Sequence, residues 1–173
     1  MVKVIKKREK KTRIPIRYLP TNLTKKDKKR QLSMLLKSRN QYKKGKYVTR
    51  DKISSYKSKK SNHIMNAQQL YNVSKIVPNK ELAEKTGCKI EALAKIVNKG
   101  EGAYFSSGSR PNQTAKSWGL ARLASAITAG KAAAVDYNII SEGCDHKKKA
   151  FILALKSRKK YGYGLKKTKK VTI

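Results

Sequence analysis

A weakly charged, alanine-rich stretch in the middle of the chain limits where a folded core can form. From Gly102 to Tyr137 the sequence reads GAYFSSGSRPNQTAKSWGLARLASAITAGKAAAVDY, and it holds the only Trp and one of the two Phe residues. Apolar residues in its second half recur at helical spacing, and its many Ala residues allow two helices to approach closely. We therefore expect this stretch to lie at the centre of a mainly α-helical fold.

The positive charge of the chain is distributed unevenly. Residues 1–60 hold 23 basic and three acidic side chains, residues 61–143 hold 10 and six, and residues 144–173 hold 11 and one. The 173-residue chain carries a formal net charge of +34, which is self-repulsive unless a polyanion or a large assembly compensates it. The distribution predicts a long basic N-terminal extension with an amphipathic helix over 1–60, a compact helical core over 61–161 and a short basic C-terminal tail over 162–173.

The two cysteines and the lack of long apolar runs bear on the compartment. Cys88 and Cys144 form no CxxC pair, and two lone thiols in a lysine-rich chain favour a reducing compartment, with Cys88 as a small core residue. No apolar run approaches the roughly 18 residues of a membrane span. The first residues, MVKVIKKREKK, lack the apolar centre of a signal peptide. We expect the protein in cytosol, nucleus or a particle assembled there.

The N-terminal extension combines lysines with a few apolar anchors. Ile14 to Pro20 favours extended backbone, because a residue before Pro is excluded from the helical region. A helix is expected from Thr24 to Tyr42, with Thr24 as its N-cap and Gly45 as its end. Its apolar stripe carries Leu32, Leu35, Leu36, Arg39 and Tyr42. Beyond it, tyrosines alternate with lysines, which suits either base stacking with phosphate contacts or wedging between protein surfaces.

Residues 79–100, NKELAEKTGCKIEALAKIVNKG, are typical of two short helices joined by a tight turn at Gly87. The small and apolar positions fit a helix-turn-helix, whose second helix enters a DNA major groove, or a plain helical hairpin. The second helix, expected from about Lys89 to Asn98 and ending at Gly100, offers no Arg or Gln for reading bases, and Glu91 would face phosphate. These features favour the hairpin.

Residues 106–114, SSGSRPNQT, form a polar loop without periodicity. Its backbone N–H groups and Arg110 suit a phosphate at the start of the next helix, although the Lys and Gly spacing of a P-loop is missing. Alternatively, its Ser, Asn and Thr side chains satisfy one another and cap that helix. We expect a rigid recognition loop with Arg110 as its main contact.

Three more helices are expected after this loop, over about 114–129, 131–141 and 147–161, with breaks at Gly130 and Gly143. In the second of them, Ala134, Val135 and Ile139 should point inward. The small residues in the first two should let these two helices approach closely.

Catalytic and metal-binding sets are not recognisable in the sequence. There is no HExxH, no P-loop and no Cys/His cluster with metal spacing, and Asp145 beside His146 makes no triad. We expect no enzyme activity, no catalytic residues, no metal and no cofactor, and no small-molecule substrate. The enzymatic alternative is an activity on nucleic acid that uses Ser107 or Ser109 with His146.

Long runs of this sequence resemble a protein family of large double-stranded DNA viruses. The runs are RYLPTNLTKKDKKRQ, MLLKSRNQYKKGKYVTR, SYKSKKSNHI, the stretch from ELAEKTGCK to AAAVDY, and CDHKKKAF, and they span residues 17–160. The resemblance is to uncharacterised basic proteins of chlorovirus-like and mimivirus-like members of the nucleocytoplasmic large DNA viruses. It implies a viral origin and a place in the virion, and it brings no catalytic residues.

Two functions therefore fit the sequence best. The first is a minor capsid or cement protein on the inner side of a large icosahedral capsid, which binds neighbouring capsid proteins through its basic arms in the virion and, during assembly, in the host cytoplasm. The alternative is a nucleic-acid-binding protein that condenses or packages DNA or RNA. The residues expected to contact such partners are Arg17, Tyr18, Lys25, Lys29, Arg30, Tyr47, Arg50, Lys57, Ser107, Arg110, Asn112, Lys147 and Lys148.

Overall fold

The computed structural model describes residues 12–164 and 169–173, and it confirms the prediction of a mainly helical fold with a compact core. Residues 1–11 of the expected basic extension and residues 165–168 of the expected tail lie outside the described residues. The helices are α1 (Lys25–Tyr42), α2 (Asn62–Tyr71), α3 (Lys80–Thr86), α4 (Ile90–Ser106), α5 (Ala115–Ile127), α6 (Lys131–Val135), α7 (Tyr137–Gly143) and α8 (Lys149–Tyr161), with a short 3-10 helix at Ile16–Tyr18. The strands are β1 (Arg13–Pro15) and β2 (Lys170–Thr172). None of these helices is both long and apolar enough to cross a bilayer.

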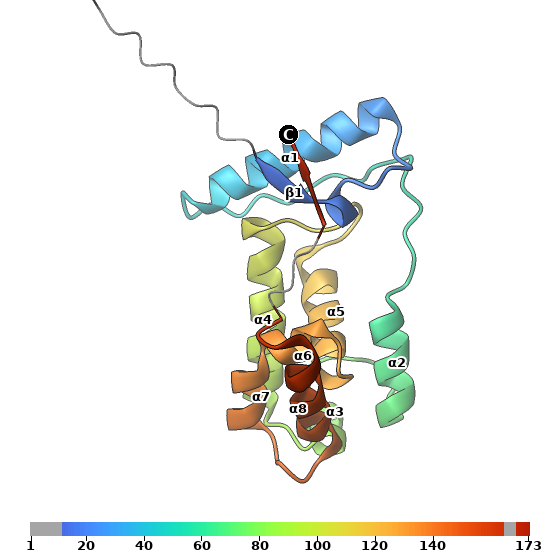
Figure 1. The fold of residues 1–173 in the computed structure, drawn as a ribbon. Helices are drawn as coiled ribbons and strands as arrows, with labels where there is room; N and C mark the ends of the chain where they lie inside the picture. The colour runs from blue at the N-terminus through green and yellow to red at the C-terminus, as the bar shows by residue number, and fades with distance from the viewer. Residues whose placement is uncertain (1–11, 165–168) are drawn as a thin grey trace, which may run out of the picture.

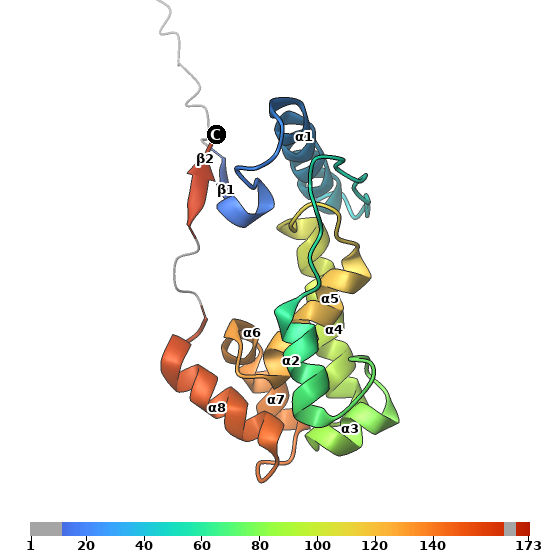
Figure 2. The same cartoon turned by 90° about the vertical axis from the view of Figure 1, so that its right-hand side faces the viewer.

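The helices α4 and α5 run side by side and connect two parts of the molecule (Figures 1 and 2). We call residues 12–60, 107–114 and 169–173 the head, and residues 61–106 and 115–164 the body. The body core contains buried side chains from all of its helices. A smaller cluster lies in the head, where Ile14, Tyr18, Leu19 and Leu35 pack together with Leu32 and with Trp118 of α5. The N-terminal region is therefore anchored to the body by apolar contacts as well as by hydrogen bonds.

The first helix follows the sequence prediction closely. Thr24 caps α1, since its hydroxyl accepts a hydrogen bond from the Asp27 backbone N–H at 3.2 Å. The expected apolar stripe is rotated slightly, because Gln31, Leu35 and Ser38 form the buried face while Leu36 is exposed. Gln31 is tolerated there because its side-chain amide donates to the Tyr18 carbonyl oxygen at 3.2 Å.

The second helix of the expected hairpin is longer than predicted. The prediction ended it at Gly100, whereas α4 continues through Gly100 and Gly102 to Ser106. Gly100 lies where α4 crosses α5, opposite Gly119, and the missing side chains let the two backbones touch. These glycines therefore serve helix packing and not helix termination.

The hairpin of α3 and α4 has one long helix packed into the body. Asn79 caps α3 by accepting the Leu82 N–H at 2.8 Å, and Gly87 takes the left-handed conformation with φ of 71°. The exposed face of α4 carries Lys89, Glu91 and Lys95 beside Glu142 of α7. Carboxylates on this face oppose the approach of a phosphate backbone, which favours the plain hairpin over a DNA-reading motif.

The predicted single helix over 131–141 is wrong, because the chain breaks at Asp136 into α6 and α7. Asp136 is 1% exposed. Its carboxylate accepts two hydrogen bonds from Arg122, at 2.7 and 2.8 Å, and forms an ion pair with Lys99 at 2.8 Å. The break turns Ile140 into the core and leaves Val135, expected to point inward, 41% exposed. The need to bury and pair this carboxylate overrides the helical periodicity of the segment.

The expectation of two lone thiols is also wrong, because Cys88 and Cys144 form a disulfide. The turn after α3 meets the turn after α7, where the Lys89 N–H donates to the Gly143 carbonyl at 2.7 Å and the Asp145 N–H donates to Gly87 at 2.8 Å. These two bonds hold the cysteines opposite each other as an isolated antiparallel bridge. A sequence separation of 56 residues gives no sign of this proximity.

The two basic flanks of the chain meet in the head. Strands β1 and β2 pair antiparallel, with Ile14 opposite Val171, and Thr12 and Ile173 exchange two backbone hydrogen bonds of 3.0 Å. Figure 2 shows β2 beside β1 at the top of the molecule, whereas α8 lies in the body below. Lysines from the end of the sequence therefore lie beside arginines from its beginning.

A candidate polyanion-binding groove in the head

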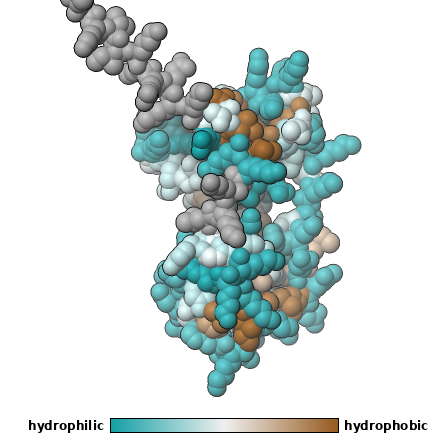
Figure 3. Space-filling view, in the orientation of Figure 1, coloured by the Kyte–Doolittle hydropathy of each residue, from teal (hydrophilic) through white to brown (hydrophobic). Residues whose placement is uncertain are grey.

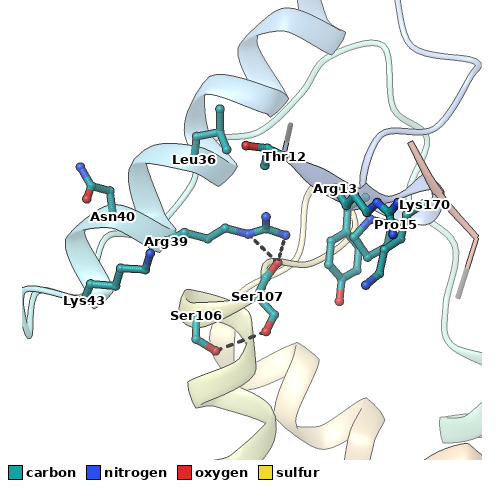
Figure 4. A pocket seen from close by; sticks show the side chains of 11 residues that line it. Thr12, Arg13, Pro15, Leu36, Arg39, Asn40, Lys43, Ser106, Ser107 and Lys170 are labelled. Atoms are coloured by element: carbon teal, nitrogen blue, oxygen red, sulfur yellow. Dashed lines mark hydrogen bonds between the residues drawn. The ribbon is translucent and has the colours of Figure 1, made fainter. Parts of the chain in front are cut away.

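A groove of about 610 Å³ lies between α1 and the β1–β2 pair, above the C-terminal end of α4 (Figure 4). Its position follows from the fold: α1 crosses over the end of α4 (Figure 1), and residues of the strand pair line the opposite side of the groove. Four separate segments contribute to it. The lining residues are Thr12, Arg13, Pro15, Tyr18, Leu36, Arg39, Asn40, Lys43, Ser106, Ser107 and Lys170.

The lining is basic and contains no carboxylate. Arg13, Arg39, Lys43 and Lys170 supply four positive charges, while Thr12, Asn40, Ser106 and Ser107 supply hydroxyl and amide groups. Lys170 reaches the groove only because β2 pairs with β1, where it lies opposite Pro15. Four cations and several hydrogen-bond donors around one hollow are the groups that a phosphate or another anion would need, which makes the groove a candidate anion site.

Arg39 is the most firmly held of these cations. Its Nε and Nη2 donate to the Ser107 carbonyl oxygen at 3.0 and 2.6 Å, which satisfies a carbonyl at the end of α4 (Figure 4). Burial lowers the pKa of the Arg39 guanidinium, and the nearby Tyr18 acts in the opposite direction. No carboxylate of the described residues forms an ion pair with it. A half-buried guanidinium without a counter-ion favours the binding of an external anion.

Arg50 is one of the predicted contact residues, but its guanidinium forms hydrogen bonds inside the head instead. Its guanidinium donates to the Ser38 hydroxyl, to the Tyr104 carbonyl and to the Ser109 hydroxyl at 3.0, 3.0 and 2.8 Å. It also lies 3.7 Å from the centre of the Tyr104 ring. Arg50 therefore joins the 46–60 segment to α1 and to the end of α4, and it positions the groove wall without facing the groove.

The loop over residues 106–114 leads from α4 to α5, and its polar side chains hold it within the head. Asn112 adopts a positive φ of 59°; its amide accepts from the Ile53 N–H at 2.6 Å and donates to the carbonyls of Ile53 and Tyr56. Ser109 is fully buried, and Thr114 caps α5 in a capping box with Ser117. The side chains of Ser107 and Arg110 remain exposed. Ser107 belongs to the groove, whereas Arg110 lies outside its lining.

The other predicted contact residues are distributed over the surface. Lys25, Lys29 and Arg30 lie on the exposed side of α1, where Arg30 pairs with Asp51 at 3.2 Å. Arg17 and Lys57 are exposed on the head, and Tyr18 is buried beside Trp118, 5.9 Å between ring centres. Lys147 and Lys148 precede α8, at the opposite end of the molecule. The structure thus brings only part of the predicted set to the groove.

Sequence reasoning missed all four cations of the groove. Arg13, Lys43 and Lys170 are ordinary members of basic runs, and nothing local marks them. Arg39 did carry a signal, because it stands inside the apolar stripe of α1, where a cation needs a specific partner. Figure 3 shows mainly hydrophilic surface on head and body alike, so the groove differs from its surroundings by its shape and its convergent cations.

Comparison with known proteins gives a family match but no activity. A family model described as "Family of unknown function (DUF5824)" matches residues 15–146, which include α1 to α7 and most of the head. No curated protein and no solved structure matches the chain.

Proposed function

The chain belongs to this family of unknown function, and we propose that it is a structural protein that binds nucleic acid through phosphate contacts in the head groove. The observation that carries the proposal is the convergence of Arg13, Arg39, Lys43 and Lys170 on one groove without a carboxylate. Lys and Arg contacts to phosphates release counterions, which supplies affinity that does not depend on sequence.

The way the basic flanks are arranged supports this function over a role as two separate gripping arms. The pairing of β1 with β2 brings basic residues from both flanks together on the head, next to the exposed basic side of α1. On the exposed face of α4, in contrast, the carboxylates of Glu91 and of Glu142 in α7 offset the charges of Lys89 and Lys95. A nucleic acid is therefore expected to bind the head and not the α3–α4 hairpin.

The test compares two triple variants that remove the same charge. The groove variant carries Arg13→Gln, Lys43→Gln and Lys170→Gln, all at exposed positions. The control carries Lys80→Gln, Lys85→Gln and Lys156→Gln, which are exposed on the body. Binding of a fluorescent oligonucleotide of about 20 residues is followed by anisotropy over a range of salt concentrations.

We expect the groove variant to bind more weakly than the control and to lower the slope of log affinity against log salt by about 2, since three phosphate contacts are lost. Equal losses in both variants would mean that only overall charge matters. An unmodified protein that binds no oligonucleotide at low salt would refute the proposed function.

A role as a minor capsid protein is the second proposal, and the resemblance to proteins of large DNA viruses supports it. In that role the basic surfaces would bind neighbouring capsid proteins on the inner side of the shell. Exposed apolar side chains near the groove, Ile16 and Leu36, provide docking points. Its test is recovery of the protein with nuclease-treated, genome-free shells. If the protein leaves the particle together with the genome, the capsid role is wrong and nucleic-acid binding gains support.

A further inference from the structure

We propose that the head binds single-stranded nucleic acid, with a base stacked on Tyr47 and the neighbouring phosphates in the groove. The inference rests on the proposed function, because it specifies which form of nucleic acid the groove accepts.

Tyr47 is the outer member of an aromatic cluster at the edge of the head. Its ring packs at steep angles against Tyr42 and Phe105, with ring centres 5.9 and 5.1 Å away, and Phe105 in turn packs on Tyr104 at 4.9 Å. Yet Tyr47 is 69% exposed. A tyrosine that is oriented by two neighbours and still open to solvent offers a fixed surface for stacking, at little cost in conformational entropy.

This cluster and the groove share the C-terminal ends of α1 and α4, although the three rings themselves lie outside the groove lining. Tyr42 directly precedes Lys43, and Phe105 directly precedes Ser106 and Ser107, which line the groove. Lys44 and Lys46 are exposed beside Tyr47. An aromatic ring next to convergent cations is the arrangement by which proteins bind single strands, since the ring stacks on a base while the cations hold the backbone.

A duplex fits these features poorly. Its bases stack on one another, so no base face is free to meet Tyr47. The groove, at about 610 Å³, has the size of a small-molecule pocket, which suits a short piece of one backbone and not a double helix. The helix that could have read a major groove, α4, is packed in the body against α5 and α7.

The experiment uses three fluorescent probes of equal length: an oligothymidylate, the same backbone without bases, and a duplex. The proteins are the unmodified chain, Tyr47→Ala, Tyr47→Phe and Tyr163→Ala. Tyr163 is the matched control, because it is 70% exposed and lies 3.8 Å from the guanidinium of Arg158 on the body. Circular dichroism and thermal unfolding check that each variant folds.

The unmodified protein is expected to bind the oligothymidylate roughly tenfold more tightly than the base-free strand. Tyr47→Ala should abolish this preference without changing the salt slope, and Tyr47→Phe and Tyr163→Ala should retain it. Equal, salt-dependent binding of all three probes by the unmodified protein would overturn the inference and leave the proposed function standing. A loss of affinity for the base-free strand in Tyr47→Ala, equal to that for the oligothymidylate, would also overturn it, because it indicates a structural role. Absence of all binding would overturn both.

Discussion

Gly100 of α4 faces Gly119 of α5 so closely that a Cβ atom on Gly100 would lie 2.6 Å from the Gly119 Cα atom. A Cβ on Gly119 would meet the Val97 carbonyl oxygen at 2.7 Å. Both atoms belong to backbone, which cannot move aside as a flexible side chain can. The two glycines therefore set the distance between the helices that connect head and body.

Gly100→Ala should lower the free energy of unfolding by about 1–3 kcal/mol, because the added methyl group forces the two helices apart. Gly102→Ala is the matched control, since it lies in the same helix and its nearest contact would be the Tyr42 hydroxyl at 4.0 Å. That change should raise stability by about 0.5–1 kcal/mol through helix propensity. Urea unfolding measures both, and equal effects of the two substitutions would contradict the close crossing.

Asp136→Asn should destabilise the body strongly. The change leaves Arg122 and Lys99 without their shared anionic partner, and breaking a buried pair in this way costs about 3–5 kcal/mol. Asp51→Asn is the control, because the Arg30–Asp51 pair is exposed and should contribute little. Thermal unfolding of both variants gives the comparison; a small loss for Asp136→Asn would show that the carboxylate is not a required centre of the α5–α6–α7 junction.

The Cys88–Cys144 disulfide predicts that the purified, oxidised protein has no titratable thiol in guanidinium, and two after reduction. Opening a cross-link that spans 56 residues should lower the free energy of unfolding by about 4 kcal/mol, because the unfolded chain regains conformational freedom. A Cys88→Ser/Cys144→Ser variant should show the same loss and become insensitive to reductant. Two free thiols in the oxidised protein would restore the expectation drawn from the sequence.

The stability of the protein should depend on pH through His63. Partial burial lowers the pKa of His63, and the positive charge of Arg110 lowers it further. As the pH falls below about 6.5, the unfolded chain takes up a proton at this residue before the folded protein does. The contribution of His63 to stability is therefore complete above about pH 6.5 and decreases as the pH falls toward the pKa of the folded state. NMR titration of the His63 ring should show the lowered pKa, and Arg110→Gln should raise it part of the way; no change would place Arg110 away from the ring.

Local features of the sequence predicted local structure well. Thr24 and Thr114 marked the starts of α1 and α5 because capping depends only on residues three positions apart. The charge distribution predicted a polyanionic partner or a large assembly, which stays a prediction, and it did not indicate which cations converge on the groove. The sequence could place neither the α4–α5 crossing nor the groove, because Gly100 pairs with Gly119, and Lys170 joins Arg13, only after distant segments have packed.

The break at Asp136 and the Cys88–Cys144 disulfide both depend on contacts between residues that are far apart in the sequence. Helical periodicity favours one helix over 131–141, and only the distant Arg122 and Lys99 explain why the chain turns there. The polar loop over 106–114 also contains residues of two kinds that the sequence does not distinguish. Ser109 and Asn112 form hydrogen bonds inside the head, whereas Ser107 is exposed and lines the groove.

The pairing of β1 with β2 has a consequence for the order of folding. Closing a loop that includes nearly the whole chain costs entropy that local contacts do not, so this pair should form after the body helices have packed. Because Lys170 enters the groove only through that pair, the last step of folding also brings the fourth cation into the groove. Partly folded chains, which expose many lysines, would then attract nucleic acid only diffusely, and ordered binding would be confined to molecules that have reached the native state.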